Sequence, residues 1–253
     1  MLIDTHCHLD AAEFDADRDA VYAAALAAGV GRIVVPGVTV NRHFRPKSKI
    51  ADYPACFEAY GIHPLYVDQS SPDDLFRLRD WLQQVPPVAV GEIGLDFYVG
   101  GIDSARQTDF FVEQLRLARE FDLPVLLHVR RAVDPVLKQL RRIGVRGGIA
   151  HAFNGSRQQA DEFIKLGFTL GFGGAMTFSG STRIRELART LPLESIVLET
   201  DAPDIPPAWL NGGRNAPAEL PRIAAVLADL RGLTLAEVIA ASAANARRVL
   251  PHI

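Results

Sequence analysis

The residues best suited to chemistry in this sequence are histidines and carboxylates that follow short apolar segments. His6 and His8 come directly after one such segment, and on a strand two residues spaced i, i+2 point to the same face. Five of the seven histidines and two acidic residues share this kind of position: His6, His8, His63, Glu92, His128, His151 and Asp201. Imidazole and carboxylate without thiolate favour Zn, Mn, Mg or Co, and burying these groups without a cation would be costly. The pattern predicts a metal centre.

The candidate ligands are too many for one tetrahedral ion. We therefore expect two divalent ions about 3.5–4 Å apart that share one bridging carboxylate. Glu92 is the natural bridge, because its strand stands between the strand of the first histidine pair and the strands that end at His128 and His151. A carboxylated lysine, the bridge in some two-metal barrels, is excluded because none of the four lysines lies at a strand end.

Other polar residues near these positions have two interpretations each. His63 is either a general acid or oxyanion donor on the rim, or a turn residue before Pro64. Glu199 is expected to orient a ligand histidine, and Asp4 to point into the interior, where it needs a hydrogen-bond partner. His43 and His252, in a helix-like stretch and at the terminus, are excluded from the site.

The elements that must position these residues are eight apolar runs alternating with helical patterns. The runs are rich in Val, Ile and Leu and do not strictly alternate in polarity, which is typical of parallel strands buried on both faces. They are Leu2–Thr5, Arg32–Pro36, Cys56–Gly61, Val88–Gly91, Val125–Leu127, Gly148–Ala150, Phe168–Phe172 and Ile196–Glu199. Helices are predicted over Asp15–Ala28, Pro72–Trp81, Ser104–Phe121, Ala132–Arg142, Ser156–Leu166, Thr182–Leu191, Ala216–Leu230 and Thr234–Leu250.

This alternation predicts an α/β fold, a single (β/α)8 TIM barrel over residues 1–253 with an extra C-terminal helix. Barrel strands converge on one mouth, where the ligand residues would meet. A doubly wound open sheet fits less well, because it would hold those strand ends too far apart and no Gly-x-Gly-x-x-Gly follows the first strand.

Composition restricts the function classes. The net charge of −3 provides no general basic surface for a nucleic-acid backbone, so any such substrate must be held by a local site. Two cysteines form no disulfide framework, and the N-terminus has no signal-like segment, so we expect a cytoplasmic location. No apolar run approaches a membrane span. We expect a monomer with no obligatory protein partner.

The motifs resemble those of the TatD-type metal-dependent deoxyribonucleases, a branch of the amidohydrolase-like barrels, over essentially the whole chain. The segments that carry the resemblance are Asp4–Asp10, Gly61–Pro64, Gly91–Asp96, Leu123–His128, His151–Gly155, Leu198–Pro203, Arg214–Pro217 and Asn245–Arg247. The resemblance implies that His6, His8 and Asp201 hold one divalent ion, that His128 and His151 hold the second, and that Glu92 joins them. It also implies hydrolysis of DNA phosphodiester bonds from a 3′ end. Val129, Ala152 and Asn154 depart from the family pattern, at positions expected to affect substrate choice.

The residue types suggest how such a reaction would proceed. Asp201 would accept a proton from a metal-activated water that attacks phosphorus. Arg130 and Arg214 are candidates for holding a phosphate, with a solvated helix start as the alternative for Arg130, and Asn215 belongs to the family-like segment beside Arg214. Two other classes stay open: a two-metal amide or ester hydrolase such as an aminoacyl-tRNA deacylase, and a non-catalytic metal-binding module.

Overall fold

In the computed structural model, which describes residues 1–40 and 48–253, the strands form two parallel sheets that follow one another around a barrel. The first has the order β1-β2-β3 and the second β4-β5-β6-β7-β8. The strands are β1 (Leu2–Asp4), β2 (Val30–Pro36), β3 (Cys56–Ala59), β4 (Val90–Asp96), β5 (Val125–Arg130), β6 (Gly148–Ala150), β7 (Phe168–Phe172) and β8 (Ile196–Leu198). His43 lies outside the described residues, so its exclusion from the site stays a prediction.

Backbone hydrogen bonds close the two sheets into one barrel. Between β3 and β4, Val88 N donates to Glu58 O (3.0 Å) and Gly91 N donates to Tyr60 O (3.0 Å). Between β8 and β1, Thr5 N donates to Leu198 O (3.1 Å). The carboxyl ends of all eight described strands therefore share one rim, and the prediction of a (β/α)8 barrel is confirmed.

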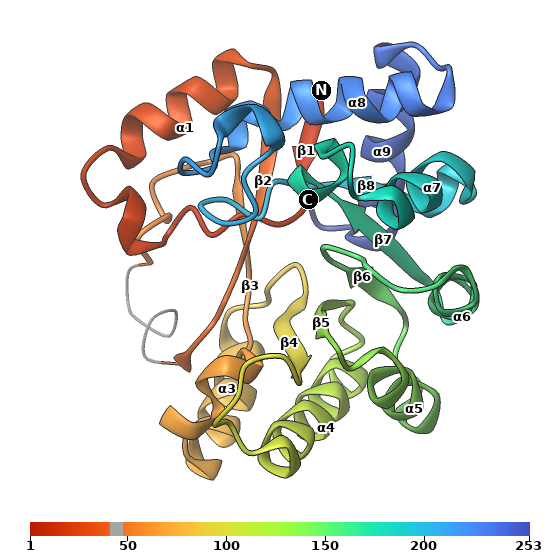
Figure 1. Cartoon of the computed structure of the whole chain (residues 1–253). Helices are drawn as coiled ribbons and strands as arrows, with labels where there is room; N and C mark the ends of the chain where they lie inside the picture. Colours follow the sequence, from red (N-terminus) through yellow and green to blue (C-terminus); the bar gives the residue numbers. More distant parts are fainter. Residues whose placement is uncertain (41–47) are drawn as a thin grey trace.

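Helices surround the strands in chain order, as Figure 1 shows. They are α1 (Arg18–Ala27), α3 (Pro72–Gln84), α4 (Ser104–Glu120), α5 (Val133–Ile143), α6 (Arg157–Lys165), α7 (Thr182–Thr190), α8 (Leu220–Arg231) and α9 (Leu235–Val249). Short 3-10 segments stand at Ala12–Phe14 (η1), Pro64–Gln69 (η2), Gly174–Thr177 (η3), Leu193–Ser195 (η4), Ala208–Leu210 (η5) and Pro217–Glu219 (η6).

Local capping explains several helix boundaries. Ser156 and Gln159 form a reciprocal capping box at the start of α6, and Thr234 and Glu237 form another at the start of α9. Gly232 ends α8 with a φ of 64°, a conformation that costs glycine nothing. These signals are local in the sequence, which is why the predicted helices agree with the observed ones to within a few residues at most ends.

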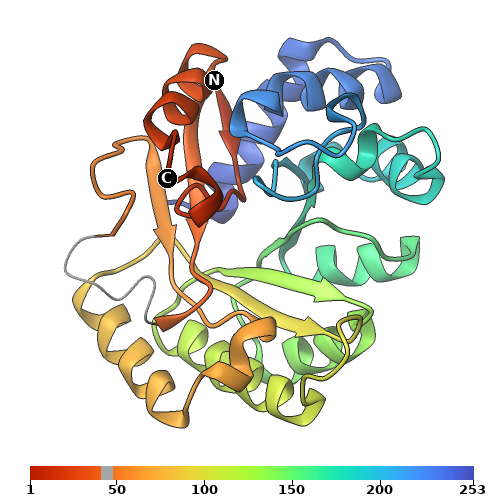
Figure 2. The same cartoon turned by 60° about the vertical axis from the view of Figure 1, so that its left-hand side comes forward.

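The extra C-terminal helix α9 closes the end of the barrel that lies away from the strands' carboxyl ends. Buried residues of one cluster come from the strands, such as Ile3, Val34 and Leu126, and from the C-terminal segment, including Val249 and Leu250. Figure 2 shows the C-terminal helices beside the N-terminal strand, and α9 contacts both β1 and β8. The barrel interior is therefore filled with side chains below the rim and leaves only the opposite mouth for a site.

Strand β4 differs from its predicted extent, because it continues through the motif Gly91–Asp96 instead of stopping before it. Its pairing with β5 shifts: Val90 lies opposite Val125, whereas Ile93 lies opposite Leu127. Two residues, Gly91 and Glu92, thus face one residue of β5. Bulges of this kind change the direction of a side chain without ending the strand. This irregularity is where Glu92 enters the barrel mouth.

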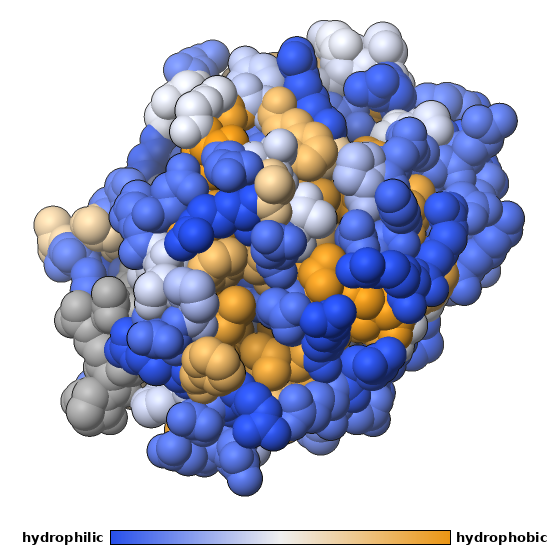
Figure 3. Space-filling model, turned by 90° about the horizontal axis from the view of Figure 1, so that it is seen from below, coloured by the Kyte–Doolittle hydropathy of each residue, from blue (hydrophilic) through white to orange (hydrophobic). Residues whose placement is uncertain are grey.

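The face of the molecule seen from below is mainly polar. Seen from below, hydrophilic residues dominate and hydrophobic residues gather in small patches between them (Figure 3). Within the part of the chain that the structure describes, no helix is long and apolar enough to cross a membrane.

Candidate metal centre

The two carboxylate oxygens of Glu92 face two different groups of histidines. Oε2 lies 3.2 Å from His6 Nε2 and 3.5 Å from His8 Nε2. Oε1 lies 2.8 Å from His151 Nε2 and 3.0 Å from His128 Nδ1. The Glu92 side chain is only 2% exposed, so its charge is held among these rings. This geometry suits a carboxylate that joins two cation positions.

The first group comes from β1 and β8. His6 Nε2 lies 3.5 Å and His8 Nε2 3.7 Å from Asp201 Oδ1, and the ligand atoms of these three residues lie within 4.8 Å of one another. Asp201 N donates to His6 O (2.8 Å), which ties the end of β8 to the end of β1. Asp201 holds a φ of 58°, an uncommon conformation for a non-glycine residue that is concentrated at functional sites.

The second group comes from β4, β5 and β6, and includes a residue from β3. His128 Nδ1 and His151 Nε2 are 3.5 Å apart and both contact Glu92. His63, Glu92 and His128 also place one ligand atom each within 4.8 Å of one another. The structure therefore brings together all six predicted metal ligands and adds His63 at their edge.

The donor set fits divalent cations. Among the described residues, both ring nitrogens of His6 and Nδ1 of His151 are buried without a hydrogen-bond partner. Unpartnered buried polar atoms are rare because each costs free energy, and coordination would satisfy them. Burial lowers the pKa of His6 to about 3, so its ring is neutral and offers a lone pair.

The other groups are strongly perturbed by one another. Burial alone would raise the pKa of Glu92, but the neighbouring imidazoles, above all His151, hold it well below its usual range. Burial would lower the pKa of His8, but the carboxylates of Glu92 and Asp201 outweigh it and raise the value to about 8. Burial raises the pKa of Asp201 to about 7. The centre is thus a compact set of imidazoles and carboxylates that shift one another's pKa values, and a bound cation would change these values again.

Two carboxylates below the centre have the positions expected from the sequence. Glu199 Oε1 accepts a hydrogen bond from Ala152 N and lies 3.7 Å from His151 Nδ1. Asp4 accepts from Thr200 N (2.9 Å) and from the Thr200 hydroxyl (2.6 Å), which is the partner that its burial required. Gly171 leaves room for Glu199, because a Cβ there would lie 2.1 Å from Glu199 Oε2.

Asp96 is a residue of the site to which sequence reasoning gave no role. Its Oδ2 lies 2.9 Å from His128 Nε2, on the side of the ring away from Glu92. Its Oδ1 accepts from the backbone N–H groups of Tyr98 and Val99 (2.8 and 3.0 Å). Burial would raise the pKa of Asp96, but His128 and these backbone donors lower it to about 2. The available signal was its spacing of four from Glu92, which places both on one strand face.

His63 lies in the turn that the sequence suggested, and its ring also reaches the centre. Leu65 N donates to His63 Nδ1 (3.1 Å), which makes His63 the N-cap of η2. The hydrogen of the neutral ring is therefore on Nε2, which lies 3.5 Å from Glu92 Oε1. Burial lowers the pKa of His63 to about 4, so the ring is neutral near pH 7. It can donate a hydrogen bond into the site from Nε2.

A cavity of about 560 Å³ opens above the centre, and every candidate ligand except the fully buried His6 contributes to its wall. The wall also contains Arg130 and the three residues that depart from the family pattern: Val129, Ala152 and Asn154. A volume of this size is typical of a small-molecule or nucleotide site.

The structure does not bring Arg214 and Asn215 into the wall of this cavity. Arg214 pairs with both carboxylate oxygens of Asp17 (2.9 and 2.6 Å) and donates to Glu13 O. The Asn215 amide is buried and donates to Thr200 O (2.8 Å) and Asp204 O (2.9 Å). These contacts tie the segment after β8 to Glu13 and Asp17, and the role of Arg214 and Asn215 in substrate binding stays a prediction.

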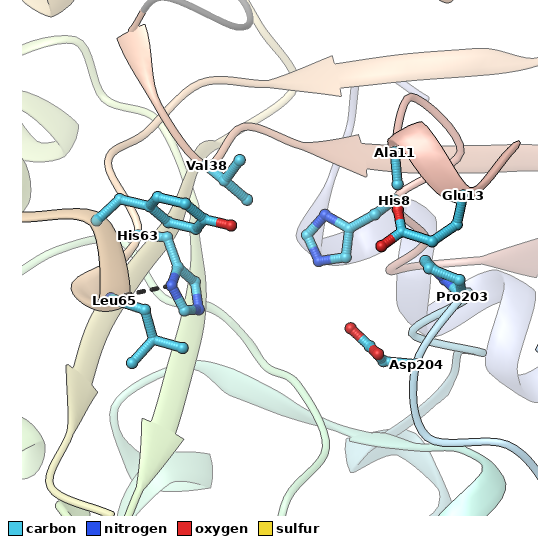
Figure 4. Close-up of a pocket in the computed structure, with 9 residues that line it drawn as sticks. His8, Ala11, Glu13, Val38, His63, Leu65, Pro203 and Asp204 are labelled. Atoms are coloured by element: carbon cyan, nitrogen blue, oxygen red, sulfur yellow. Dashed lines mark hydrogen bonds between the residues drawn. The ribbon is translucent and has the colours of Figure 1, made fainter. Parts of the chain in front are cut away.

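A smaller pocket of about 180 Å³ adjoins the cavity beside His8. Figure 4 shows His63 on one side of it and His8 on the other, with the Asp204 carboxylate below His8 in this view. Glu13 also lines this pocket, and among the described residues its wall contains no lysine or arginine. This side of the centre is therefore acidic.

The fold and the site define a metal-dependent hydrolase, in which a (β/α)8 barrel presents imidazole and carboxylate ligands at the carboxyl ends of its strands. The profile of the family described as TatD related DNase matches residues 3–251, and the chain belongs to this family. The resemblance found in the sequence is thereby confirmed, as is the prediction of a metal-dependent hydrolase acting on ester bonds.

Individual relatives agree with this assignment. The uncharacterized metal-dependent hydrolase YjjV of Escherichia coli is 40% identical over 232 residues, 90% of each chain. Its crystal structure superposes with a TM-score of 0.95 at 38% identity, covering 100% of this chain and 98% of that one. A protein of Cronobacter sakazakii named 3′-5′ ssDNA/RNA exonuclease TatD is 34% identical, covering 98% of this chain and 97% of its own.

Proposed function

We propose that the chain hydrolyses phosphodiester bonds at the 3′ end of DNA, with two divalent ions held by His6, His8, Asp201, His128 and His151 and bridged by Glu92. Two such ions, when bound, supply an activated water and neutralise charge on the phosphoryl oxygens. The name of the Cronobacter relative supports a single-stranded substrate and this polarity.

The observation that carries the proposal is that the two carboxylate oxygens of Glu92 point in different directions. One of its oxygens faces the β1 histidines and the other faces the histidines of β5 and β6. A structural ion pair would need only one such face. Two faces with neutral or titratable imidazoles on each side are what a pair of ions requires.

Two side chains of this chain have proton-handling roles in the proposal. Asp201 lines the cavity and, with a pKa near 7 before cations bind, is placed to accept a proton from the attacking water. His63 donates from Nε2 and would stabilise charge that develops on the substrate oxygen. These roles are separate, because the two residues reach the cavity from β8 and β3.

The shape of the site favours a chain end over an internal bond. The small pocket beside His8 carries the carboxylates of Glu13 and Asp204, which would repel a second phosphate but accept hydrogen bonds from sugar hydroxyls. The larger cavity has Arg130 in its wall, a cation suited to phosphate. A terminal nucleoside would therefore lie on the first side and the rest of the strand on the second.

The test is the release of mononucleotides from single-stranded and duplex oligonucleotides, after chelation and addition of single metals. We expect 5′-mononucleotides to be released from the 3′ end only with metal present. An aminoacyl ester assayed in parallel distinguishes the alternative: release of the amino acid without nucleotide release would identify an ester hydrolase such as an aminoacyl-tRNA deacylase. Turnover equal to that of the metal-free control would refute both.

The remaining features of the proposal concern the whole chain. Residues 1–253 act as a single hydrolase domain, and the chain works as a monomer without an obligatory protein partner. Two free cysteines favour a cytoplasmic location. Sedimentation of the purified chain tests the oligomeric state.

A further inference from the structure

The loop after β4 exposes three consecutive apolar residues beside the metal centre. Phe97, Tyr98 and Val99 are 38%, 51% and 37% exposed. The loop is not loosely attached, because Asp96 accepts hydrogen bonds from two of its N–H groups and Phe97 N donates to Arg130 O (2.9 Å). Rigid apolar groups exposed on the rim of a cavity often mark a binding surface.

Two guanidinium groups from the end of β5 lie over the same aromatic ring. Arg130 Cζ is 3.8 Å and Arg131 Cζ 4.8 Å from the centroid of the Tyr98 ring. Both arginines are exposed, and within the described part of the chain neither guanidinium group forms an ion pair or a hydrogen bond. Arg214, in contrast, is neutralised by Asp17. Arg130 and Arg131 therefore keep their charge available for a ligand.

We propose that Tyr98, Arg130 and Arg131 form a platform that binds the nucleotides upstream of the bond to be cleaved, with a base stacked against the Tyr98–guanidinium group and the arginines on backbone phosphates. This inference rests on the proposed function and names the part of the site that selects a strand. Aromatic rings bind bases of any sequence by stacking, and guanidinium groups pair with phosphate.

The position of the platform agrees with the direction of the strand. It stands at the ends of β4 and β5, two residues beyond His128, whereas the acidic pocket beside His8 stands between the ends of β1, β3 and β8. In the barrel order β8 and β1 lie across the mouth from β4 and β5, whereas β3 lies next to β4. A strand with its terminal nucleoside in the acidic pocket would leave the centre across the platform.

Asp96 couples the platform to the chemistry. The same carboxylate contacts His128 with one oxygen and holds the backbone of Tyr98 with the other. The contacts of Asp96 with Tyr98 and with His128 therefore fix the position of a base stacked on Tyr98 relative to His128, a predicted metal ligand. The platform therefore adjoins the cavity, whose wall includes Asp96 and Arg130.

The experiment measures KM and kcat of three variants, Tyr98→Ala, Tyr98→Phe and Arg131→Ala. Each variant is assayed with three substrates: a single-stranded oligonucleotide, the same oligonucleotide with abasic sites upstream of the terminal bond, and bis(4-nitrophenyl) phosphate. We expect Tyr98→Ala to raise KM for the intact oligonucleotide about 5- to 150-fold, the range that corresponds to the loss of one stacked base. Tyr98→Phe keeps the ring and should restore most of the binding. The Tyr98→Ala effect should shrink at least fivefold with abasic sites.

Arg131→Ala tests the phosphate contact through its salt dependence. Loss of one phosphate contact should reduce the slope of log KM against log salt by about 0.7 for a single strand. Arg142→Ala, an exposed arginine in the last turn of α5 at the other end of the barrel, is the matched control, as Phe76→Ala is for an exposed aromatic residue.

The possible outcomes separate this inference from the proposed function. Wild-type protein that hydrolyses none of the three substrates would refute the function itself. Wild-type cleavage of the oligonucleotide with KM unchanged in Tyr98→Ala, or changed equally with and without bases, would overturn the platform and leave the function intact. An unchanged salt slope in Arg131→Ala would remove that arginine from the phosphate path.

Discussion

Replacement of Glu92 by Gln is the most direct test of the centre, because it keeps the size of the side chain and removes its charge. The structure places this charge between two groups of imidazoles, with the side chain 2% exposed. Two unit charges 4 Å apart interact by about 4 kcal/mol at an effective dielectric of 20, so two dications repel by roughly four times as much. A neutral amide cannot offset repulsion of this size.

The variant should therefore lose one ion. The position bounded by His128 and His151 should empty first, because Asp201 stays beside His6 and His8 on the other side. Asp96 does not replace the lost charge, since it contacts the far nitrogen of His128. Metal analysis after gel filtration should give close to one ion per chain for Glu92→Gln and two for the wild type, with turnover lower by several orders of magnitude.

A charge-retaining variant provides the control. Glu92→Asp shortens the side chain but keeps the carboxylate, so it should bind more metal than Glu92→Gln even if its turnover is poor. Thermal unfolding of both variants checks that the barrel has formed. Two ions per chain together with near-normal cleavage in Glu92→Gln would refute the bridge and the arrangement built on it.

Three further predictions follow from the geometry. Because Glu92 and Asp201 outweigh burial and raise the pKa of His8 to about 8, a metal ion must displace a proton from His8 below that pH, and metal affinity should fall as the pH drops from 8. Calorimetry in buffers of different ionisation enthalpy should detect this proton release at pH 7, and its absence would contradict the assignment of His8 as a ligand. Gly171→Ala should displace Glu199 and cost about 10- to 100-fold in metal affinity by titration, whereas Gly180→Ala, where a Cβ meets no described atom within 4 Å, should match the wild type. Leu250→Ala, buried at the end of α9, should cost about 2–5 kcal/mol and lower Tm by roughly 5–15 °C, with metal content unchanged; a shift below 1 °C would exclude α9 as the lower seal of the barrel.

Much of this arrangement is predictable from the sequence because its causes are local or periodic. Apolar runs of β-branched residues give the strands, and caps such as Thr234 with Glu237 give the helix ends. The barrel then forces the carboxyl ends of the strands onto one rim. That rule alone brings His6 and Asp201 together across 195 residues of sequence.

What the sequence does not predict depends on particular three-dimensional contacts. The bulge that turns Glu92 into the mouth follows from the register of β4 against β5, which no local pattern encodes. The pairing of Arg214 with Asp17 joins residues almost 200 positions apart, so a free and a neutralised arginine look alike in the sequence. The role of Asp96 and the ring hydrogen of His63 also depend on neighbours that only the folded chain brings near.

The distribution of paired and unpaired cations explains how an acidic chain can hold a polyanion. Several surface arginines, such as Arg79 and Arg189, pair with a carboxylate, which reduces the attraction for nucleic acid away from the mouth. The guanidinium groups of Arg130 and Arg131 have no carboxylate partner where the strand would leave the centre, while Glu13 and Asp204 would disfavour phosphate beside His8. In the proposed function, this charge placement would favour one orientation of the bound strand. Selection of a chain end would then follow from charge placement around the centre and would need no extended basic surface.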